Sequence, residues 1–288
     1  MSNKFGTMQQ RDMSNQVPEV QNETNIELFF ENYAETAKSE VESLLQSFHA
    51  KKVGCGVWYM QHKLAASILN RKMEILSDKD KILTVYLCFL IYCEFIYCGI
   101  CRHHAAGFIL ENSITENIER YDEETKNILF DWFYKFHYAA NTHAGNRPSI
   151  SLEDVREFYV EGKEGKLKQS FFPYEKIHYG IWHYLFLLTT KCHNKKQIMY
   201  VYYLVLEFMP ELDETRRTIF HDFCSEHRFS NALDDEDLPK EELCIAFFDW
   251  LYALHKKMNE SENIKVYPLE VMKNVYFYLD VCTDNCDK

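Results

Sequence analysis

The feature that most constrains this chain is an internal repeat built around its tryptophans. Residues 130–137, Phe-Asp-Trp-Phe-Tyr-Lys-Phe-His, return at 248–255 as Phe-Asp-Trp-Leu-Tyr-Ala-Leu-His. Upstream, Gly-Val-Trp at 56–58 returns as Gly-Ile-Trp at 180–182. All 4 tryptophans of the chain fall at these paired positions, in the same order in each half. Because an ordered set of matches marks a duplicated structural unit, we predict two related modules, at residues 26–165 and 170–280.

Helical periodicity runs through both modules. From residue 26 onward, apolar residues recur at three- and four-residue spacing, which is typical of amphipathic helices, and strand-like alternation is hard to find. Helix breakers are scarce, with 9 glycines and 6 prolines in 288 residues. We therefore predict an all-α fold, with first-module helices near residues 26–49, 57–76, 80–96, 99–111, 124–143 and 151–160.

Charge and termini narrow the classes of protein further. The formal net charge of −12 argues against a nucleic-acid partner, which needs a basic surface. Residues 1–25 are polar and lack an apolar h-region, so we expect a mobile tail, no signal peptide and a cytoplasmic location. The apolar stretch from Ile82 to Cys101 contains Glu94 and many tyrosines. We therefore expect no membrane span there.

Cys98-Gly-Ile-Cys101 is the first candidate for chemistry among the 10 cysteines. Two thiols at this spacing can close a small disulfide, and a helix beginning after them would lower the pKa of one thiol. Arg102, His103 and His104 follow directly and could add positive potential. The motif also occurs in structural zinc sites and as inert cysteines. Redox chemistry, zinc binding and an inert pair all remain open at this point.

Two further pairs have the i, i+4 spacing that places side chains on one face of a helix. Trp58 and His62 could sandwich a planar ligand between their rings. His137 and Asn141 can hydrogen-bond in two directions, which suits the edge of a purine ring. The alternative for both pairs is a structural role, and Trp132 is expected to be core or pocket wall.

Taken in order, these residues resemble the Erv/ALR family of FAD-linked sulfhydryl oxidases. The family pattern is G-x-x-x-W-x-x-x-H, then C-x-x-C, then W-x-x-x-x-H-N-x-V-N, then a basic residue with proline. The matching residues, all within about residues 50–160, are Gly54, Trp58, His62, Tyr97, Cys98, Cys101, Trp132, His137, Asn141, Pro148 and Tyr159. The usual proline before the first cysteine is absent, Tyr138 replaces an asparagine, and Arg147 lies about one position late. The motif is most similar to virus-encoded members of the family, such as those of baculoviruses, so association with virus particles is also expected.

The resemblance implies an FAD-binding helical bundle that oxidises protein thiols and passes the electrons to molecular oxygen, giving hydrogen peroxide. Cys101 would be the sulfur nearest the flavin and Cys98 the interchange thiol. The residues implied to hold FAD are Gly54, Trp58, His62, His137, Asn141, Arg147 and, as an aromatic lid, Tyr159. A shuttle disulfide usually lies outside the core site, and Cys282 and Cys286 in the tail 281–288 are candidates. The alternative is that they are two unrelated tail cysteines.

The second module is expected to have lost this chemistry. Cys224-Ser-Glu-His227 is aligned with the C-x-x-C motif, and Phe186 stands at the position of His62. Trp250, His255 and Asn259 remain, and we expect them to preserve packing. We predict a degenerate module without FAD that packs on the first as an internal pseudo-dimer, unless the chain forms an ordinary homodimer. The competing hypotheses are a zinc- or partner-binding helical module and a degenerate oxidase used as an assembly scaffold.

Overall fold

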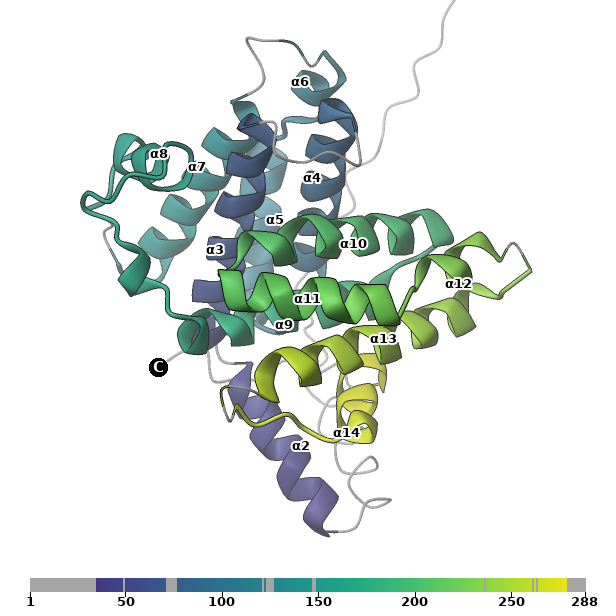
Figure 1. Ribbon diagram of the computed structural model, residues 1–288. Coiled ribbons are helices and arrows are strands. Elements are labelled where there is room, and N and C mark those ends of the chain that lie inside the picture. The colour runs from purple at the N-terminus through teal and green to yellow at the C-terminus, as the bar shows by residue number, and fades with distance from the viewer. Residues whose placement is uncertain are drawn as a thin grey trace, which may run out of the picture.

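The computed structural model describes residues 35–48, 50–70, 77–120, 122, 127–146, 149–235, 237–260, 262 and 264–278. Within these residues the chain is helical and contains no strand, which confirms the predicted all-α fold (Figure 1). The predicted tails, residues 1–25 and 281–288, lie outside the described residues.

The first half contains α2 and six further helices. Their bounds are α2 Glu35–Ser47, α3 Ala50–Leu69, α4 Asp78–Glu94, α5 Gly99–Glu111, α6 Thr115–Glu119, α7 Ile128–His143 and α8 Leu152–Tyr159. The prediction for α5 is correct to the residue, but α3 begins at Ala50 rather than near residue 57. Gly54 and Gly56 weaken the helical signal in this stretch. Packing of α3 against the second half keeps it helical nevertheless.

The second half follows the same order of helices. After the short η1 (Gln169–Phe171) come α9 Tyr174–Lys191, α10 Lys195–Phe208, η2 Met209–Glu211, α11 Glu214–Glu226, α12 Ser230–Asp234, α13 Lys240–Glu260, α14 Leu269–Lys273 and the π-helical η3 Asn274–Tyr278. The helices α9 to α14 thus repeat the order of long and short helices in α3 to α8.

Matched hydrogen bonds show that the two halves share local geometry. The indole nitrogen Nε1 of Trp132 donates to the carbonyl oxygen of Asn112 at 2.6 Å, and that of Trp250 donates to the carbonyl oxygen of His227 at 2.7 Å. Asn112 and His227 are the C-cap residues of α5 and α11. A tyrosine in each half bonds a distant carbonyl oxygen in the same way, Tyr134 to Ile150 and Tyr252 to Tyr267. The repeat seen in the sequence is therefore also a repeat of contacts.

Four helices of the first half enclose the residues of the candidate site. Helix α3 contacts α4 and α7, and α5 contacts the same two helices, so the four form a closed bundle. The short α8 covers one side by packing on α3 and α7. The interior is rich in aromatic rings, among them Phe89, which meets Trp132 and Phe133 edge to face.

The two halves cross where two glycines meet. Helices α3 and α9 make the most extensive contact in the molecule, centred on Gly56 and Gly180. A Cβ on Gly56 would overlap the carbonyl oxygen of Ile177 and lie 2.8 Å from Cα of Gly180. A Cβ on Gly180 would lie 2.7 Å from Cα of Gly56. Only glycine at both positions allows the backbones to approach so closely.

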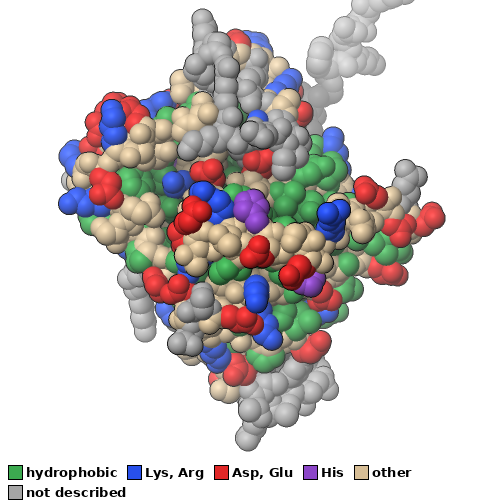
Figure 2. Space-filling view, viewed as in Figure 1, with side chains coloured by type: hydrophobic (Ala, Val, Ile, Leu, Met, Phe, Trp, Pro, Cys, Tyr) green, Lys and Arg blue, Asp and Glu red, His purple; other side chains and the backbone are tan. Residues whose placement is uncertain are grey.

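The surface of the described residues is mixed in character. Figure 2 shows acidic and basic side chains interspersed over one face, with apolar side chains between them. None of the helices that the structure describes has the length and apolarity to cross a membrane.

Candidate functional site

The two cysteines of the C-x-x-C motif form a disulfide at the beginning of α5. Their Cα atoms lie 5.2 Å apart. Cys98 is the N-cap residue of α5, and its Sγ accepts a hydrogen bond from the backbone N–H of Cys101 at 3.1 Å. The N-terminus of a helix carries positive potential, which stabilises a thiolate placed there. After reduction, Cys98 is therefore the sulfur whose anionic form the helix supports.

Access to the disulfide differs between its two ends. Cys98 is 5% exposed and Cys101 is half-buried, whereas Ile100 between them is 48% exposed. Tyr97, directly before Cys98, stacks on Phe48 at 5.1 Å between ring centroids. The interchange role that the resemblance gives to Cys98 therefore needs its surroundings to open, because Cys101 is the more accessible residue here.

A flat aromatic wall lies on α3 and α7 of the same bundle. The rings of Trp58 and His137 stack with centroids 4.4 Å apart and an angle of 8°. His62 Nε2 lies 3.3 Å from His137 Nδ1, behind this stack. His137 thus covers one face of Trp58 and also contacts His62. The sandwich of a planar ligand between Trp58 and His62 stays a prediction.

Burial keeps both histidines of this wall neutral. Desolvation lowers the pKa of His62 well below its ordinary value, and the nearby His137 lowers it further. Burial also lowers the pKa of His137, to about 4. His62 Nδ1 finds no hydrogen-bond partner among the described residues. A buried polar atom without a partner costs about 1–3 kcal/mol, so this nitrogen is a suitable contact for a bound polar group.

The remaining predicted cofactor residues fall into three groups. Gly54 lies one helical turn before Trp58, and a Cβ added there would meet nothing within 4 Å, so the space beside it is open. Asn141 is half-buried on α7, one turn after His137. Arg147 lies outside the described residues, as do Pro148 and the candidate shuttle cysteines Cys282 and Cys286.

Tyr159 is buried beside the histidines of this wall. It lies at the end of α8, is 7% exposed, and packs its ring 5.2 Å from that of His62. Burial raises the pKa of its hydroxyl well above the ordinary value. Helix α8 folds back on α3 and α7 and carries Tyr159 into the core. The role of an aromatic lid stays a prediction.

Zinc binding has no ligand set in the described part of the chain. No group of three or more His, Cys, Asp or Glu residues there has the arrangement to hold a metal ion. His104 does stack on His143 at 4.0 Å, which explains part of the histidine cluster after Cys101 as ring packing.

The second half has a different counterpart to the dithiol than the sequence suggested. Helices α5 and α11 both have 13 residues, and Asp213 caps α11 as Cys98 caps α5. Asp213 Oδ1 accepts from the backbone N–H of Arg216 at 2.9 Å. The alignment of Cys224 with the motif is therefore wrong, because Cys224 lies near the other end of α11. Asp213 and Arg216 occupy the two cysteine positions.

Arg216 is held where the second sulfur would be. It is 4% exposed, and its two terminal nitrogens each lie 2.8 Å from a carboxylate, Asp213 on one side and Glu262 on the other. The guanidinium carbon lies 3.7 Å from the ring centroid of Tyr174. Such a charge is stable in the interior because both terminal nitrogens are paired with carboxylates. An ion pair thus occupies, in this half, the positions that the disulfide occupies in the first.

The second half also fills the space that matches the aromatic wall. Trp182 and His255 repeat the positions of Trp58 and His137, with centroids 4.6 Å apart. Phe186 replaces His62 and contacts His255, as expected for a lost polar contact. The cavity that these residues line is about 30 Å³. That volume suits about one water molecule.

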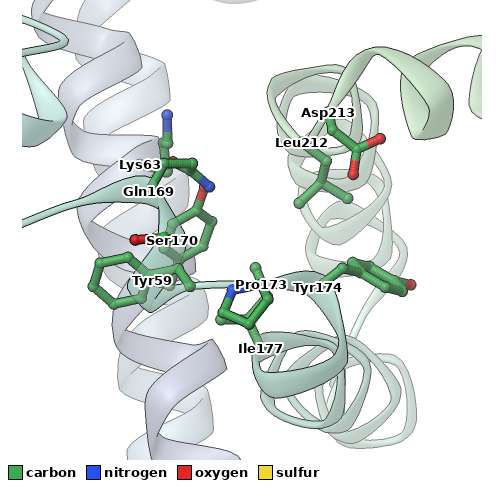
Figure 3. Close-up of a pocket in the computed structure, with 10 residues that line it drawn as sticks. Tyr59, Lys63, Gln169, Ser170, Pro173, Tyr174, Ile177, Leu212 and Asp213 are labelled. Atoms are coloured by element: carbon green, nitrogen blue, oxygen red, sulfur yellow. The ribbon is translucent and has the colours of Figure 1, made fainter. Parts of the chain in front are cut away.

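A pocket between the two halves was not foreseen from the sequence. Its volume is about 330 Å³. Tyr59 and Lys63 of α3 lie on one side with Gln169, and Leu212 and Asp213 lie on the other (Figure 3). These residues come from separate segments, so no local motif could have brought them together.

The residue types of the first half are of the kinds that could hold a flavin cofactor. A flat ring system could lie against Trp58 and His137, beside the open space at Gly54. The unpaired nitrogen of His62 would gain a partner from a polar group of such a ligand. Together these features provide an aromatic surface with polar atoms at its edge, which is the usual make-up of a cofactor site.

Comparison with known proteins adds no relative to this description. No protein-family model matches the chain, and neither characterised proteins nor solved structures give a match.

Proposed function

We propose that the chain is an FAD-dependent thiol oxidase with one active site, in its first half. The observation that carries the proposal is the Cys98–Cys101 disulfide capping α5, in the same four-helix bundle as the Trp58–His137 wall. The overall reaction would join two substrate thiols in a disulfide and transfer two electrons and two protons to oxygen, giving hydrogen peroxide. FAD, when bound, would accept the electrons from the cysteine pair and pass them to oxygen.

The cysteine pair would act by thiol–disulfide exchange. A substrate thiolate attacks one sulfur of the Cys98–Cys101 disulfide, forms a mixed disulfide and displaces the other sulfur as a thiolate. A second substrate thiolate then releases the substrate as a disulfide and leaves both cysteines reduced. Once the pair is reduced, the hydrogen bond from the Cys101 N–H to Cys98 Sγ would stabilise the thiolate of Cys98.

The histidines and tryptophan would bind and orient the ring system. Trp58 and His137 offer a continuous flat surface, and neutral imidazoles can donate or accept a hydrogen bond. Asn141 would add a second polar contact from the next turn of α7. The protein's contribution is thus to hold the reactive ring beside the cysteines and to shield it from water.

The first test is an absorbance spectrum of the purified protein, followed by oxygen consumption with a small dithiol. We expect flavin absorbance and steady oxygen uptake from the wild type. Cys101→Ser should keep the flavin and lose at least about a hundredfold in rate, because a single thiol cannot accept two electrons as a disulfide. A colourless protein, or full activity of Cys101→Ser, would contradict the proposal.

Cys224→Ser is the matched control for that experiment. Cys224 is a half-buried free cysteine in the second half, near the end of α11. If the two cysteines of α5 carry the activity, Cys224→Ser should oxidise the dithiol at the rate of the wild type.

We also propose that Cys282 and Cys286 shuttle electrons to the core disulfide. Tyr276 lies 5.2 Å from Phe48 between ring centroids, and Phe48 lies 5.1 Å from Tyr97, the neighbour of Cys98. Cys282 lies four positions after Tyr278, the last residue of η3, and an extended chain of that length spans about 14 Å. The length of the tail is therefore compatible with contact between the two disulfides.

Replacing both tail cysteines separates shuttling from core chemistry. We expect Cys282→Ser with Cys286→Ser to oxidise a small dithiol at the normal rate, because that substrate reaches the core pair directly. Oxidation of a reduced protein should slow about tenfold, since buried Cys98 would have to meet a bulky partner. Equal rates for both substrates in the double variant and the wild type would rule out the shuttle.

A further inference from the structure

An aromatic side chain just before α3 packs on the second half, and one just before α9 packs on the first half. Phe48 precedes α3, yet its ring packs 4.4 Å from His183 and 5.2 Å from Tyr276 of the second half. Phe172 precedes α9, yet its ring packs 5.3 Å from Tyr59 and 6.3 Å from Tyr159 of the first half. Each half therefore receives a ring from the segment that leads into the other half.

The ring of Phe172 stands at one end of a continuous series of contacts. Tyr159 lies between Phe172 and His62, with a centroid distance of 5.2 Å to His62. His62 meets His137 at 3.3 Å between nitrogens, and His137 stacks on Trp58. The other end of the series is thus the aromatic wall proposed to hold the cofactor.

A second contact holds the same segment in place. Gln169 Nε2 donates to the hydroxyl oxygen of Tyr59 at 3.4 Å, and Phe158 packs 5.6 Å from Phe172. The segment that carries Gln169 and Phe172 belongs to neither four-helix bundle, since it joins α8 to α9. It is nevertheless fixed against α3 and α8 by both polar and apolar contacts.

We propose that Phe172, supplied by the segment that leads into the second half, is a positioning residue of the first half's cofactor site. Its ring fixes Tyr159, and Tyr159 in turn fixes His62 and the His137–Trp58 stack. The inference rests on the proposed function only in naming flavin as the ligand. The second half thus contributes to the active site even though it has no dithiol of its own.

The physical basis is the packing of buried Tyr159 and His62 next to half-buried Phe172. Rings in a close-packed interior keep one orientation because their neighbours leave no room for another. Removing the ring of Phe172 opens space beside Tyr159. Tyr159 and His62 can then take other rotamers, and the angle of the His137–Trp58 pair is no longer determined.

Nuclear magnetic resonance of labelled histidine rings tests the positioning without any cofactor. In Phe172→Ala we expect the ring signals of His62 and His137 to move and that of His183 to remain. The pKa of His137 should also rise from about 4 toward the ordinary imidazole value, because burial is what lowers it. Phe48→Ala is the matched control, and there the signal of His183 should move instead.

Flavin affinity gives the second measurement. We expect Phe172→Ala to weaken FAD binding by about tenfold or more, and Phe172→Leu to restore most of it by refilling the space. Phe229→Ala should bind FAD as the wild type does, because its ring packs on Tyr202, Phe247 and Trp250 of the second half.

The outcomes separate this inference from the proposed function. If the wild type takes up no flavin but Phe172→Ala still moves His62 and His137, the oxidase proposal fails and the positioning stands. If Phe172→Ala binds flavin normally and leaves both histidines unmoved, the positioning is wrong. Equal losses of flavin affinity in Phe229→Ala and Phe172→Ala would also overturn it, because they would indicate general destabilisation.

Discussion

A single methyl group decides whether α3 and α9 can cross at their closest point. At Gly56 a Cβ would overlap a backbone oxygen of α9, and backbone cannot give way as a side-chain end can. We expect Gly56→Ala to lower the free energy of unfolding by about 3 kcal/mol or more, at the upper end of overpacking effects. Urea unfolding of the cofactor-free protein would measure it.

Gly54→Ala is the control two residues away on the same helix. A Cβ there meets nothing within 4 Å, and alanine favours helix over glycine by about 1 kcal/mol. The variant should therefore be as stable as the wild type or slightly more stable. Equal destabilisation by both substitutions would mean that the close crossing of α3 and α9 is not what Gly56 provides.

Individual site residues differ in how far the sequence predicts them. The pairs Trp58–His62 and His137–Asn141 could be found because helical spacing alone places each pair on one face. The stack of Trp58 on His137 could not, because it depends on how α3 packs against α7. Tyr159 was predicted as a site residue, but its burial depends on the direction in which α8 folds back.

At the scale of helices, periodicity predicted the fold class and most helices well. The clearest failure was the partner of the C-x-x-C motif in the second half. Matching by residue type selected Cys224, whereas the geometry selects Asp213 and Arg216. A comparison by residue type does not match a cysteine with an aspartate. Both can nevertheless accept the N–H at the first turn of a helix, so the position keeps its capping role.

The way in which the two halves pack together also could not be predicted from the sequence. The repeat predicted two modules of similar design, and Gly56 and Gly180 were visible as part of it. Nothing local distinguishes a glycine that permits a close crossing from one that merely starts a helix. Only the contact between α3 and α9 assigns the first role to both.

At the scale of the whole molecule, buried histidines tie stability to pH. Burial lowers the pKa of His137 to about 4 and that of His183 and His255 to about 3, and lowers that of His62 well below normal. The unfolded chain binds protons at these sites below about pH 6.5, and the folded chain does not. Stability should therefore fall as the pH drops from about 6.5 toward 4, by up to about 1.4 kcal/mol per pH unit for each histidine.

Urea midpoints between neutral and mildly acidic pH would measure this dependence. His183→Gln should flatten the curve by removing one buried imidazole, and His193→Gln, at an exposed position, should leave it unchanged. A stability that stays constant from pH 7 to about 5 would contradict the burial of these rings in solution.

The glycine crossing has a consequence for how the molecule responds to dilution. Two separate chains that met at such a contact would part as their concentration fell. Here α3 and α9 belong to one chain, so their contact is intramolecular and does not depend on protein concentration. The ring of Phe172 should therefore stay packed on the first half at any protein concentration.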